Sequence, residues 1–447
     1  MRKRWLPITL IAAILIGVVA WAVWPAEVTY TTKDERLTIG DVTLDTRLYL
    51  PKTASGTSKV PALLLGHGFG GSKESVAEDA KELAGQGYAV LAWTARGFGA
   101  STGQIHLNSP DHEVRDAQGL LDWLAKQPEI RTDKPGDPRV GVVGGSYGGA
   151  LALLLAGQDD RVDAIVPMIT WNDLGASLFP GNVFKQSWAG IFFSGGMSRG
   201  DRGNPQCGRW ATDVCQTYLR VAETGKLDDE AKAVLQQRSP AQTLNRIKAP
   251  TLLIQGEADS LFPLSEADAN ARGITGAPVR VAWYTGGHDG GQGPLSDQNR
   301  VKFLTVQWLD HYVKGEGEAP SNVFTYSRIA GLDPVEQGRL ATGFQLDNYP
   351  GLAGDKTVSM DISGPPQPVA NPPNGTPAAI SSLPQAGALS SLVGGIGGGW
   401  GGGGRAVGWG RGEEGGVWVG GGCGVGGEGW GGGWSGGGVV VRCFFFF

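Results

Sequence analysis

Metal-binding patterns are missing from this chain, and their absence excludes several kinds of site. The five histidines include no H-x-H or H-E-x-x-H arrangement, and no pair of carboxylates has the spacing of metal ligands. The sequence therefore predicts no metal site. The chain also lacks the G-x-x-x-x-G-K-[ST] loop that binds nucleotide phosphates, which argues against a transport-associated protein.

An excess of basic charge is missing too. Lysine and arginine number 38 against 43 aspartates and glutamates, and the formal net charge is -5 at pH 7. Proteins that bind nucleic acid gather positive charge on one face or along one helix. We therefore expect no nucleic-acid partner.

A long uncharged run stands at the start of the chain. Met1-Arg-Lys-Arg precedes an apolar stretch over residues 5–24, which is long enough to span a bilayer as a helix. This order is typical of a signal peptide or an N-terminal anchor, to which we assign residues 1–26. Tryptophans flank its small-residue cleavage sites, and its basic end should stay inside the cell. We expect the rest of the protein to be exported to the cell envelope or beyond, touching the membrane only through this segment.

Only four cysteines occur, and two of them lie close together, at Cys207 and Cys215. The residues around Cys207, Gly-Asn-Pro-Gln-Cys-Gly, look like an exposed loop. A disulfide that closes this loop fits an oxidising compartment. The spacing alone leaves two free thiols as the alternative.

The most informative pattern is Gly144-Gly-Ser-Tyr-Gly-Gly. It lies between an apolar run typical of a buried strand, residues 138–145, and a helix-forming run, residues 147–156. A G-x-S-x-G sequence at a strand-to-helix turn is the nucleophile elbow of α/β-hydrolases. Its glycines make room for the strained backbone at Ser146, and the free N–H groups of the helix face an oxyanion. The alternative interpretation is a glycine-rich turn without chemistry.

A nucleophilic serine needs a histidine base and an acid that orients the base. In α/β-hydrolases both follow the serine, which leaves His288 and His311 as candidates for the base. His288 lies in a glycine-rich loop after the strand-like residues 279–284, whereas His311 lies near the end of a long amphipathic helix pattern. We assign His288 as the general base, with a loop histidine of no role as the alternative.

The acid should follow a strand between the serine and the histidine. Asp259 comes after the strand-like residues 251–255 and a glycine, and a proline follows soon after. Glu257, nearer the strand end, and Asp289, next to the base, are rivals. We favour Asp259 because this order is typical of an acid-bearing loop.

Two backbone N–H groups should form the oxyanion hole. One belongs to Tyr147, directly after the nucleophile. The other should come from the glycine-rich loop after the strand-like run that begins at residue 60, where Phe69 is the first candidate and Gly70 the second. His67 then shapes this loop and is not the base. This chemistry requires no cofactor.

These motifs resemble those of the α/β-hydrolase family that holds the X-Pro dipeptidyl-peptidases and cocaine esterase. In cocaine esterase a tyrosine hydroxyl serves the oxyanion hole from the loop after the early strand, whereas Phe69, near that place, has no hydroxyl. The resemblance extends over about residues 29–314 and more weakly to about residue 392. It rests on Gly66-His-Gly, Ala95-Arg-Gly-Phe-Gly-Ala-Ser-Thr-Gly, Glu113 to Asp116 with residues 121–128, the elbow, Gly256 to Asp259, and Gly287-His288.

Strand and helix patterns alternate through this region, which predicts an α/β fold with a mostly parallel sheet covered on both faces. An antiparallel hairpin of residues 28–32 and 43–50 should lie at the sheet edge. An insertion at about residues 170–245 is expected to form a helical cap over the active site. We expect most of its aromatic side chains to pack between cap helices, although caps also shape apolar pockets. These are Trp171, Phe179, Phe184, Trp188, Phe192, Phe193 and Trp210.

The chain changes character after the predicted catalytic domain, residues 27–317. Residues 318–392 resemble the start of the family's β-rich C-terminal domain, but its remainder does not follow, so we expect a truncated stub. Residues 393–447 form a Gly/Trp-rich low-complexity tail that contains no Asp, His, Lys or Leu, too glycine-rich to bury a core. We hypothesise that this tail is translated from a shifted reading frame. The alternative is a genuine adhesive segment.

The function predicted from these patterns is an exported serine hydrolase that cleaves a small-molecule ester or a short X-Pro peptide through an acyl-enzyme. Peptidase action would need an anionic pocket for the substrate's free amine, for which Asp173, Asp201 and Asp213 are the candidates in the cap. The rival is a non-catalytic, surface-anchored binding protein on a hydrolase scaffold. A complete set of serine, acid and histidine argues against that rival. The sequence makes no prediction of the oligomeric state.

Overall fold

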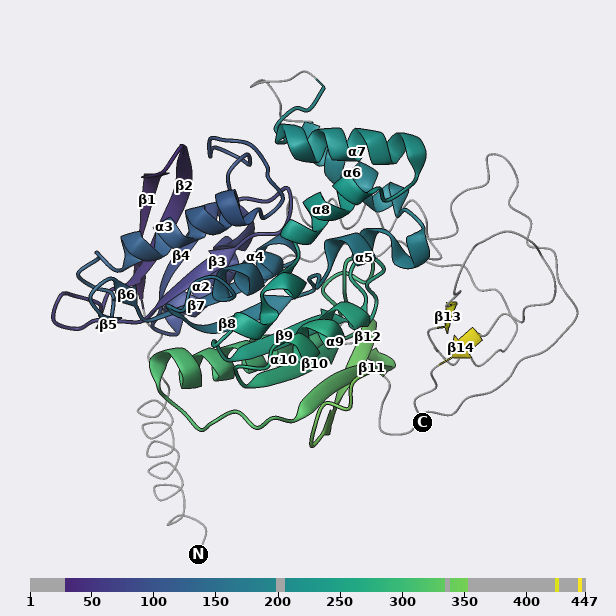
Figure 1. Cartoon of the computed structure of the whole chain (residues 1–447). Helices are drawn as coiled ribbons and strands as arrows, with labels where there is room; N and C mark the ends of the chain where they lie inside the picture. Colours follow the sequence, from purple (N-terminus) through teal and green to yellow (C-terminus); the bar gives the residue numbers. More distant parts are fainter. Residues whose placement is uncertain (1–28, 198–205, 334–337, 353–422, 426–440, 444–447) are drawn as a thin grey trace, which may run out of the picture.

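A ten-stranded sheet forms the centre of the molecule (Figure 1). The computed structural model describes residues 29–197, 206–333 and 338–352, together with the backbone of 423–425 and 441–443. The sheet strands are β1 (Tyr30–Ile39), β2 (Val42–Pro51), β3 (Ala62–Gly66), β4 (Ala89–Thr94), β7 (Val140–Gly145), β8 (Val162–Met168), β9 (Thr251–Gly256), β10 (Val279–Tyr284), β11 (Phe324–Asp333) and β12 (Gly338–Leu346).

The strand order is β1-β2-β4-β3-β7-β8-β9-β10-β11-β12. All neighbours from β4 to β11 pair in parallel, while the hairpins at the two edges, β1–β2 and β11–β12, are antiparallel. The central strands are continuous apolar runs because both of their faces are covered. This arrangement confirms the predicted α/β fold with a mostly parallel sheet, and the predicted edge hairpin is present.

Helices cover the two faces of the sheet and divide the core into two layers. The alternating direction of strand side chains is visible in β3, where Leu64 packs into one layer and Leu63 and Leu65 into the other. The first layer contains α3 (Arg115–Leu124), α4 (Tyr147–Ala156) and α9 (Leu264–Gly273), and the second contains α2 (Ala77–Gly85) and α10 (Leu295–Leu309). Every residue of α4 is buried, which explains why its sequence is apolar all round.

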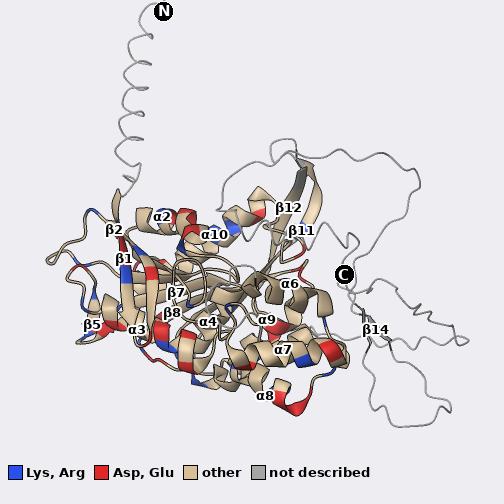
Figure 2. Cartoon of the chain, turned by 90° about the horizontal axis from the view of Figure 1, so that it is seen from above, with Lys and Arg blue, Asp and Glu red and all other residues tan. Residues whose placement is uncertain are grey.

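A helical cap stands above the sheet, as predicted (Figure 1). It consists of α5 (Leu174–Leu178), α6 (Gln186–Met197), α7 (Thr212–Thr224) and α8 (Asp229–Gln237). Cys207 and Cys215 form a disulfide at the start of α7, which is the first of the two alternatives for this pair. Figure 2 shows acidic and basic residues interspersed along the described chain, including the cap helices α7 and α8, in keeping with the small net charge.

The C-terminal hairpin β11–β12 continues the central sheet beyond β10. The domain boundary proposed between residues 317 and 318 remains a prediction. The hairpin that follows it pairs directly with β10. Beyond it, the described residues form only a small antiparallel pair, β13 (Cys423–Val425) and β14 (Val441–Cys443). No helix within the described ranges is long and apolar enough to cross a membrane. The predicted signal or anchor, residues 1–26, lies outside those ranges, as does most of the glycine-rich tail.

Candidate active site

Ser146 lies at a sharp turn between β7 and α4. Its backbone has φ 53° and ψ -115°, a region that side-chain-bearing residues rarely occupy and that marks local strain. The turn packs against the end of β3 so closely that a Cβ on Gly148 would lie 2.5 Å from the carbonyl oxygen of Gly66. A glycine at position 148 is therefore required by this close approach of two backbones.

His288 and Asp259 complete a hydrogen-bonded chain with this serine. The Nε2 atom of His288 lies 2.9 Å from Ser146 Oγ, and its Nδ1 atom lies 2.7 Å from Asp259 Oδ2. Nδ1 donates to the carboxylate when Nε2 accepts from the serine hydroxyl, which is the tautomer a general base requires. The three candidate residues, 142 positions apart at their extremes, thus meet beyond the carboxyl ends of the interior strands β7, β9 and β10.

The loops that carry the acid and the histidine fix each other. Asp259 is buried, and its Oδ1 atom accepts hydrogen bonds from the backbone N–H groups of Leu261 and Phe262 at 3.1 and 2.8 Å. Gly287 has φ 137°, and a Cβ there would lie 2.5 Å from the carbonyl oxygen of Ala258. Only glycine allows the histidine loop to lie this close to the acid loop.

The two rival acids lie elsewhere. Asp289 accepts a hydrogen bond from the backbone N–H of Ser260 at 2.6 Å and so braces the acid loop from the other side. Glu257 is partly buried, and burial raises the pKa of its carboxyl to about 7. No hydrogen bond joins either side chain to His288 among the described residues, whereas Asp259 has one.

The loop after β3 carries His67 and Phe69, one of the two candidate oxyanion donors, whereas the other, Tyr147, begins α4. The Nε2 atom of His67 accepts from the backbone N–H of Ala95 at 2.9 Å, and its Nδ1 atom lies 2.7 Å from the carbonyl oxygen of Gly68. His67 is thus held inside the loop, as expected of a residue that shapes it. No described residue accepts a hydrogen bond from the backbone N–H of Phe69 or Tyr147, so both donors remain predictions for the oxyanion hole.

The buried His67 should make the folded state sensitive to acid. Burial lowers the pKa of its imidazole from 6.5 to about 4, so the unfolded chain binds a proton between these values and the folded chain does not. The contribution of this neutral imidazole to the free energy of unfolding is therefore fully present above pH 6.5. It is lost as the pH falls towards 4, by about 2–3 kcal/mol at pH 4.5. Denaturant unfolding of the wild type and of His67→Gln at pH 7.5 and 4.5 measures this loss.

The His67→Gln variant should lose that much less stability than the wild type between the two pH values. Carboxyls with raised pKa values, such as Glu113 and Glu257, act in the opposite direction, but they are common to both proteins. The difference between the two proteins thus isolates the imidazole. Equal losses in wild type and variant would contradict the prediction.

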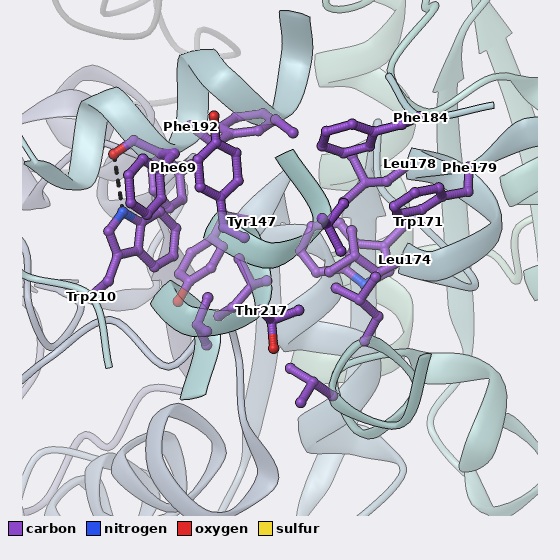
Figure 3. Close-up of a pocket in the computed structure, with 18 of the residues that line it drawn as sticks. Phe69, Tyr147, Trp171, Leu174, Leu178, Phe179, Phe184, Phe192, Trp210 and Thr217 are labelled. Atoms are coloured by element: carbon purple, nitrogen blue, oxygen red, sulfur yellow. Dashed lines mark hydrogen bonds between the residues drawn. The ribbon is translucent and has the colours of Figure 1, made fainter. Parts of the chain in front are cut away.

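Ser146 lines a cavity of about 100 Å³, and Figure 3 shows the mostly apolar side chains that surround it. On one side Phe69 stacks on Trp210, with ring centroids 5.3 Å apart, and the ring of Tyr147 lies edge-on to Phe69 at 5.7 Å. The opposite side comes from α5, the residues that flank it, and α8. Of the described residues that line this cavity, none is charged. The cavity therefore suits an apolar group attached to the carbon that the serine attacks.

Most aromatic residues of the cap both pack between cap helices and line the cavity. Packing between helices is present, since Phe193 on α6 stacks on Tyr218 of α7 with ring centroids 3.9 Å apart. Six of the seven aromatic residues also line the cavity, together with residues of α7 and α8. These six residues are Trp171, Phe179, Phe184, Phe192, Phe193 and Trp210.

Asp173 and Asp213, the two described candidate carboxylates for a substrate amine, do not line this cavity. Asp173 caps the N-terminus of α5 by accepting from the backbone N–H of Ala176 at 2.9 Å. Asp213 forms an ion pair with Arg238. Asp201, the third candidate, lies outside the described residues.

Sequence reasoning missed the contacts that hold the cap against the triad. Trp188 and Phe262 lie edge-on to the imidazole of His288, with ring centroids 6.0 and 5.3 Å away. Lys185, at the start of α6, donates to the carbonyl oxygens of Ser260 and Leu261 at 2.6 and 3.0 Å. The apolar Leu261-Phe262 pair after the acid was the signal in the sequence that this loop faces a cavity.

Comparison with known proteins agrees with this geometry. Residues 40–270, just over half of the chain, match the family described as X-Pro dipeptidyl-peptidase (S15 family). Dipeptidyl aminopeptidase BIII of Pseudoxanthomonas mexicana is 25% identical over 340 residues, which cover 74% of this chain and 42% of that protein. The quorum-quenching protein AidA of Acinetobacter baumannii is 31% identical over 142 residues, covering 31% of this chain and 44% of that protein.

A solved structure has the same fold. The CocE/NonD family hydrolase of Staphylococcus aureus superimposes with a TM-score of 0.51 at 15% identity, over 72% of this chain and 57% of that one. The chain spans between a third and a half of the length of the curated relatives it matches. The α/β-hydrolase fold and the family match agree in naming the class of this protein. It belongs to the S15 family of X-Pro dipeptidyl-peptidases.

Proposed function

We propose that this protein hydrolyses esters whose acyl group is apolar and uncharged, with Ser146 as nucleophile, His288 as general base and Asp259 as the acid that orients the base. The observation that carries the proposal is the apolar cavity that Ser146 lines. An acyl group in that cavity places its carbonyl carbon near Ser146 Oγ. Desolvation of such a group on binding is favourable, by about 0.8 kcal/mol for each buried methylene.

The first half of the reaction forms an acyl-enzyme. The Nε2 atom of His288 takes the proton of Ser146 Oγ, 2.9 Å away, as the oxygen attacks the carbonyl carbon. The carboxylate of Asp259 stabilises the imidazolium that forms. The backbone N–H groups of Tyr147 and Phe69 donate to the tetrahedral oxyanion. The imidazolium then returns its proton to the leaving alcohol, and the C–O bond to that alcohol breaks.

The second half hydrolyses the acyl-enzyme with the same groups. His288 takes a proton from water, and the resulting hydroxide attacks the acyl carbon. The oxyanion again accepts from the two backbone N–H groups. Collapse of the intermediate breaks the bond to Ser146 Oγ, which recovers its proton from His288. The products are a carboxylic acid and the free enzyme.

Removal of X-Pro dipeptides from a free N-terminus is the second candidate within the family. Its substrate carries an ammonium group close to the scissile bond, and that charge must be paired when it is taken out of water. The described residues that line the cavity offer no carboxylate to pair it. This absence is our reason for proposing an uncharged acyl group. The binding-protein alternative is disfavoured by membership in a hydrolase family.

We further propose that the protein acts outside the cytoplasm, held there by residues 5–24. The basic residues at the start of the chain and the apolar run that follows them support this location. The disulfide between Cys207 and Cys215 supports it as well, because disulfides persist in oxidising compartments. Fractionation of cells that produce the protein, followed by protease treatment of intact cells, tests the location.

The substrate proposal predicts a specific order of rates. The purified chain should hydrolyse p-nitrophenyl butyrate with a kcat/KM about 15-fold above that of the acetate, because two more methylenes are buried at about 0.8 kcal/mol each. p-Nitrophenyl hemisuccinate has the same acyl length but a negative charge, so it should react at least tenfold more slowly. Ala-Pro-p-nitroanilide should react more slowly than either uncharged ester. Faster cleavage of the anilide than of butyrate would replace the proposal with the dipeptidyl-peptidase function.

A further inference from the structure

Glu113 is a buried carboxylate that the proposed mechanism does not use. Its side chain is 2% exposed, and it lies in the short π-helical turn Pro110–Val114 that precedes α3. Its Oε1 atom accepts from the backbone N–H of His106 at 2.7 Å, and its Oε2 atom accepts from that of Ser109 at 2.9 Å. Taking a carboxylate out of water is costly, so a specific partner is needed to explain its presence here.

That partner is Tyr147, the residue directly after the nucleophile. Its hydroxyl donates to Glu113 Oε1 at 3.2 Å and accepts from the backbone N–H of Asn108 at 3.1 Å. The side-chain amide of Asn108 also donates to the backbone carbonyl oxygen of Tyr147 at 2.7 Å. Tyr147 is thus held at its ring end and at its backbone by the same segment, whose hydrogen bonds Glu113 organises.

The segment from His106 to Ser109 is itself under strain. Leu107 and Asn108 both have φ 60° without being glycine, which costs about 1–2 kcal/mol for each residue. Such conformations persist where surrounding contacts dictate them, and they gather at functional sites. Leu107 lines the same cavity as Ser146. The strained segment therefore borders both the cavity and the residue that carries a candidate oxyanion donor.

The same segment is joined to the cap. The carbonyl oxygen of His106 accepts from Arg238 Nε at 2.8 Å, and Arg238 follows α8 directly. Trp171, at the other end of the cap insertion, donates from its indole N–H to the carbonyl oxygen of Arg238 at 2.9 Å. A continuous chain of hydrogen bonds thus runs from the cap through His106 and Glu113 to Tyr147.

We propose that Glu113 is a positioning residue that acts through the hydroxyl of Tyr147 to hold the Tyr147 backbone N–H at the place where the oxyanion forms. The proposal rests on the function proposed above, in which that N–H is an oxyanion donor. Oxyanion stabilisation depends on donors that are already in place before charge develops. Tyr147 is the first residue of α4, so helical hydrogen bonding does not use its N–H. The peptide plane that contains this N–H also contains the carbonyl of Ser146, which accepts from Thr170 Oγ1 at 2.8 Å. The anchored ring and carbonyl of Tyr147 hold the Cα atom at the other end of that plane.

Glutamate fits this role better than its amide. Three donors converge on Glu113, from His106, Ser109 and Tyr147. A carboxylate accepts at both oxygens, whereas glutamine accepts at one and donates from the other end. In Glu113→Gln the NH₂ group would face the donor from Ser109, or the donors from His106 and Tyr147. Tyr147→Phe is the cleaner variant, since it removes one oxygen and keeps the ring in the cavity wall and the backbone N–H.

The test separates positioning from folding. The proteins are the wild-type full chain, Tyr147→Phe, Glu113→Gln and the control Asp111→Asn. The exposed carboxylate of Asp111 forms an ion pair with Arg115. Competent sites are first counted by titration with a fluorophosphonate. Steady-state hydrolysis of p-nitrophenyl butyrate, per competent site, then gives kcat and KM. Inhibition by a butyl trifluoromethyl ketone, whose adduct with Ser146 carries an oxyanion, is compared with inhibition by butyrate.

We expect Tyr147→Phe to lower kcat per competent site by about 10- to 100-fold with KM within about threefold. Inhibition by the trifluoromethyl ketone should weaken by a similar factor, while inhibition by butyrate stays unchanged. Glu113→Gln should behave alike if it folds, and Asp111→Asn should match the wild type. Wild-type kcat and ketone inhibition in Tyr147→Phe would overturn the inference, as would losses that vanish after correction for site number. Ester hydrolysis that survives in Ser146→Ala would instead overturn the proposed function.

Discussion

Replacement of Ser146 by alanine should lower kcat for p-nitrophenyl butyrate by about a million-fold, and replacement of His288 by alanine should cost nearly as much. The two groups share one proton transfer across the 2.9 Å between Oγ and Nε2, so neither retains its function without the other. Residues that act as one unit are strongly non-additive. The double variant should therefore be no slower than either single variant. Initial rates at high enzyme concentration, with the uncatalysed rate subtracted, measure all three.

His311→Ala is the matched control for the histidine. It lies in the turn Asp310–Lys314 after α10, away from the triad residues, with its ring against Tyr312. It should keep wild-type kcat and KM. A fluorophosphonate should label the wild type at Ser146 and leave Ser146→Ala unlabelled, as read by mass spectrometry of the peptides. More than about 1% residual kcat in Ser146→Ala would mean that another nucleophile carries the reaction.

The elements that bear the proposed triad were predictable because each is defined locally. The helix expected from residue 147 to 156 is α4 with the same bounds, and the strand expected over 279–284 is β10. Gly148 in the elbow and Gly287 in the histidine loop can be recognised in the sequence, and each lies where two backbones approach closely. The order of serine, acid and histidine then follows from the connectivity of a parallel sheet.

The cavity and the Glu113 segment were not predictable because they depend on contacts between distant residues. The hydroxyl of Tyr147 meets Glu113 from 34 positions away, and Trp171 meets Arg238 from 67 positions away. An aromatic side chain in a cap has the same sequence pattern whether it faces a neighbouring helix or a cavity. Periodicity gives the buried face of an element but not the identity of what covers it.

The C-terminal hairpin is more closely joined to the site than its sequence suggests. Asp297, at the start of α10, accepts from the backbone N–H and the hydroxyl of Thr285 at 2.7 and 2.8 Å. The same carboxylate accepts from Ser327 on β11 and pairs with Arg300. Thr285 begins the loop that carries His288. Through Ser327, the hairpin β11–β12 thus helps to hold the loop that carries His288.

Loss of the carboxylate at Asp116 should destabilise the protein by about 3–5 kcal/mol, since it leaves the buried guanidinium of Arg96 with only the exposed carboxylate of Asp41, 3.1 Å away, as an ionic partner. Asp116 and Arg96 form a bidentate ion pair with N–O distances of 2.6 and 2.7 Å, and their side chains are 4% and 3% exposed. The pair joins two of the motifs on which the family resemblance rests, the loop after β4 and the start of α3. Denaturant unfolding of the wild type and Asp116→Ala, compared at their midpoints, measures the cost.

Two further variants show whether the cost comes from the unpaired charge. The double variant Arg96→Met with Asp116→Leu removes both charges and should recover most of the stability, because well-packed apolar residues often replace a buried ion pair without loss. Asp111→Ala breaks an exposed pair with Arg115 and should change stability by less than about 0.5 kcal/mol. A cost below about 1 kcal/mol for Asp116→Ala would show that Arg96 finds water or another partner.

The same ion pair should affect catalysis through the loop it anchors. Phe98, two residues after Arg96, packs edge-on against Phe69 and Tyr147, with ring centroids 5.0 and 5.7 Å apart. These two residues carry the candidate oxyanion donors and part of the cavity wall. A loosened Arg96 loop would therefore release both donors together. Asp116→Ala should lower kcat for p-nitrophenyl butyrate at temperatures where it is still fully folded, and the double variant should restore kcat as it restores stability.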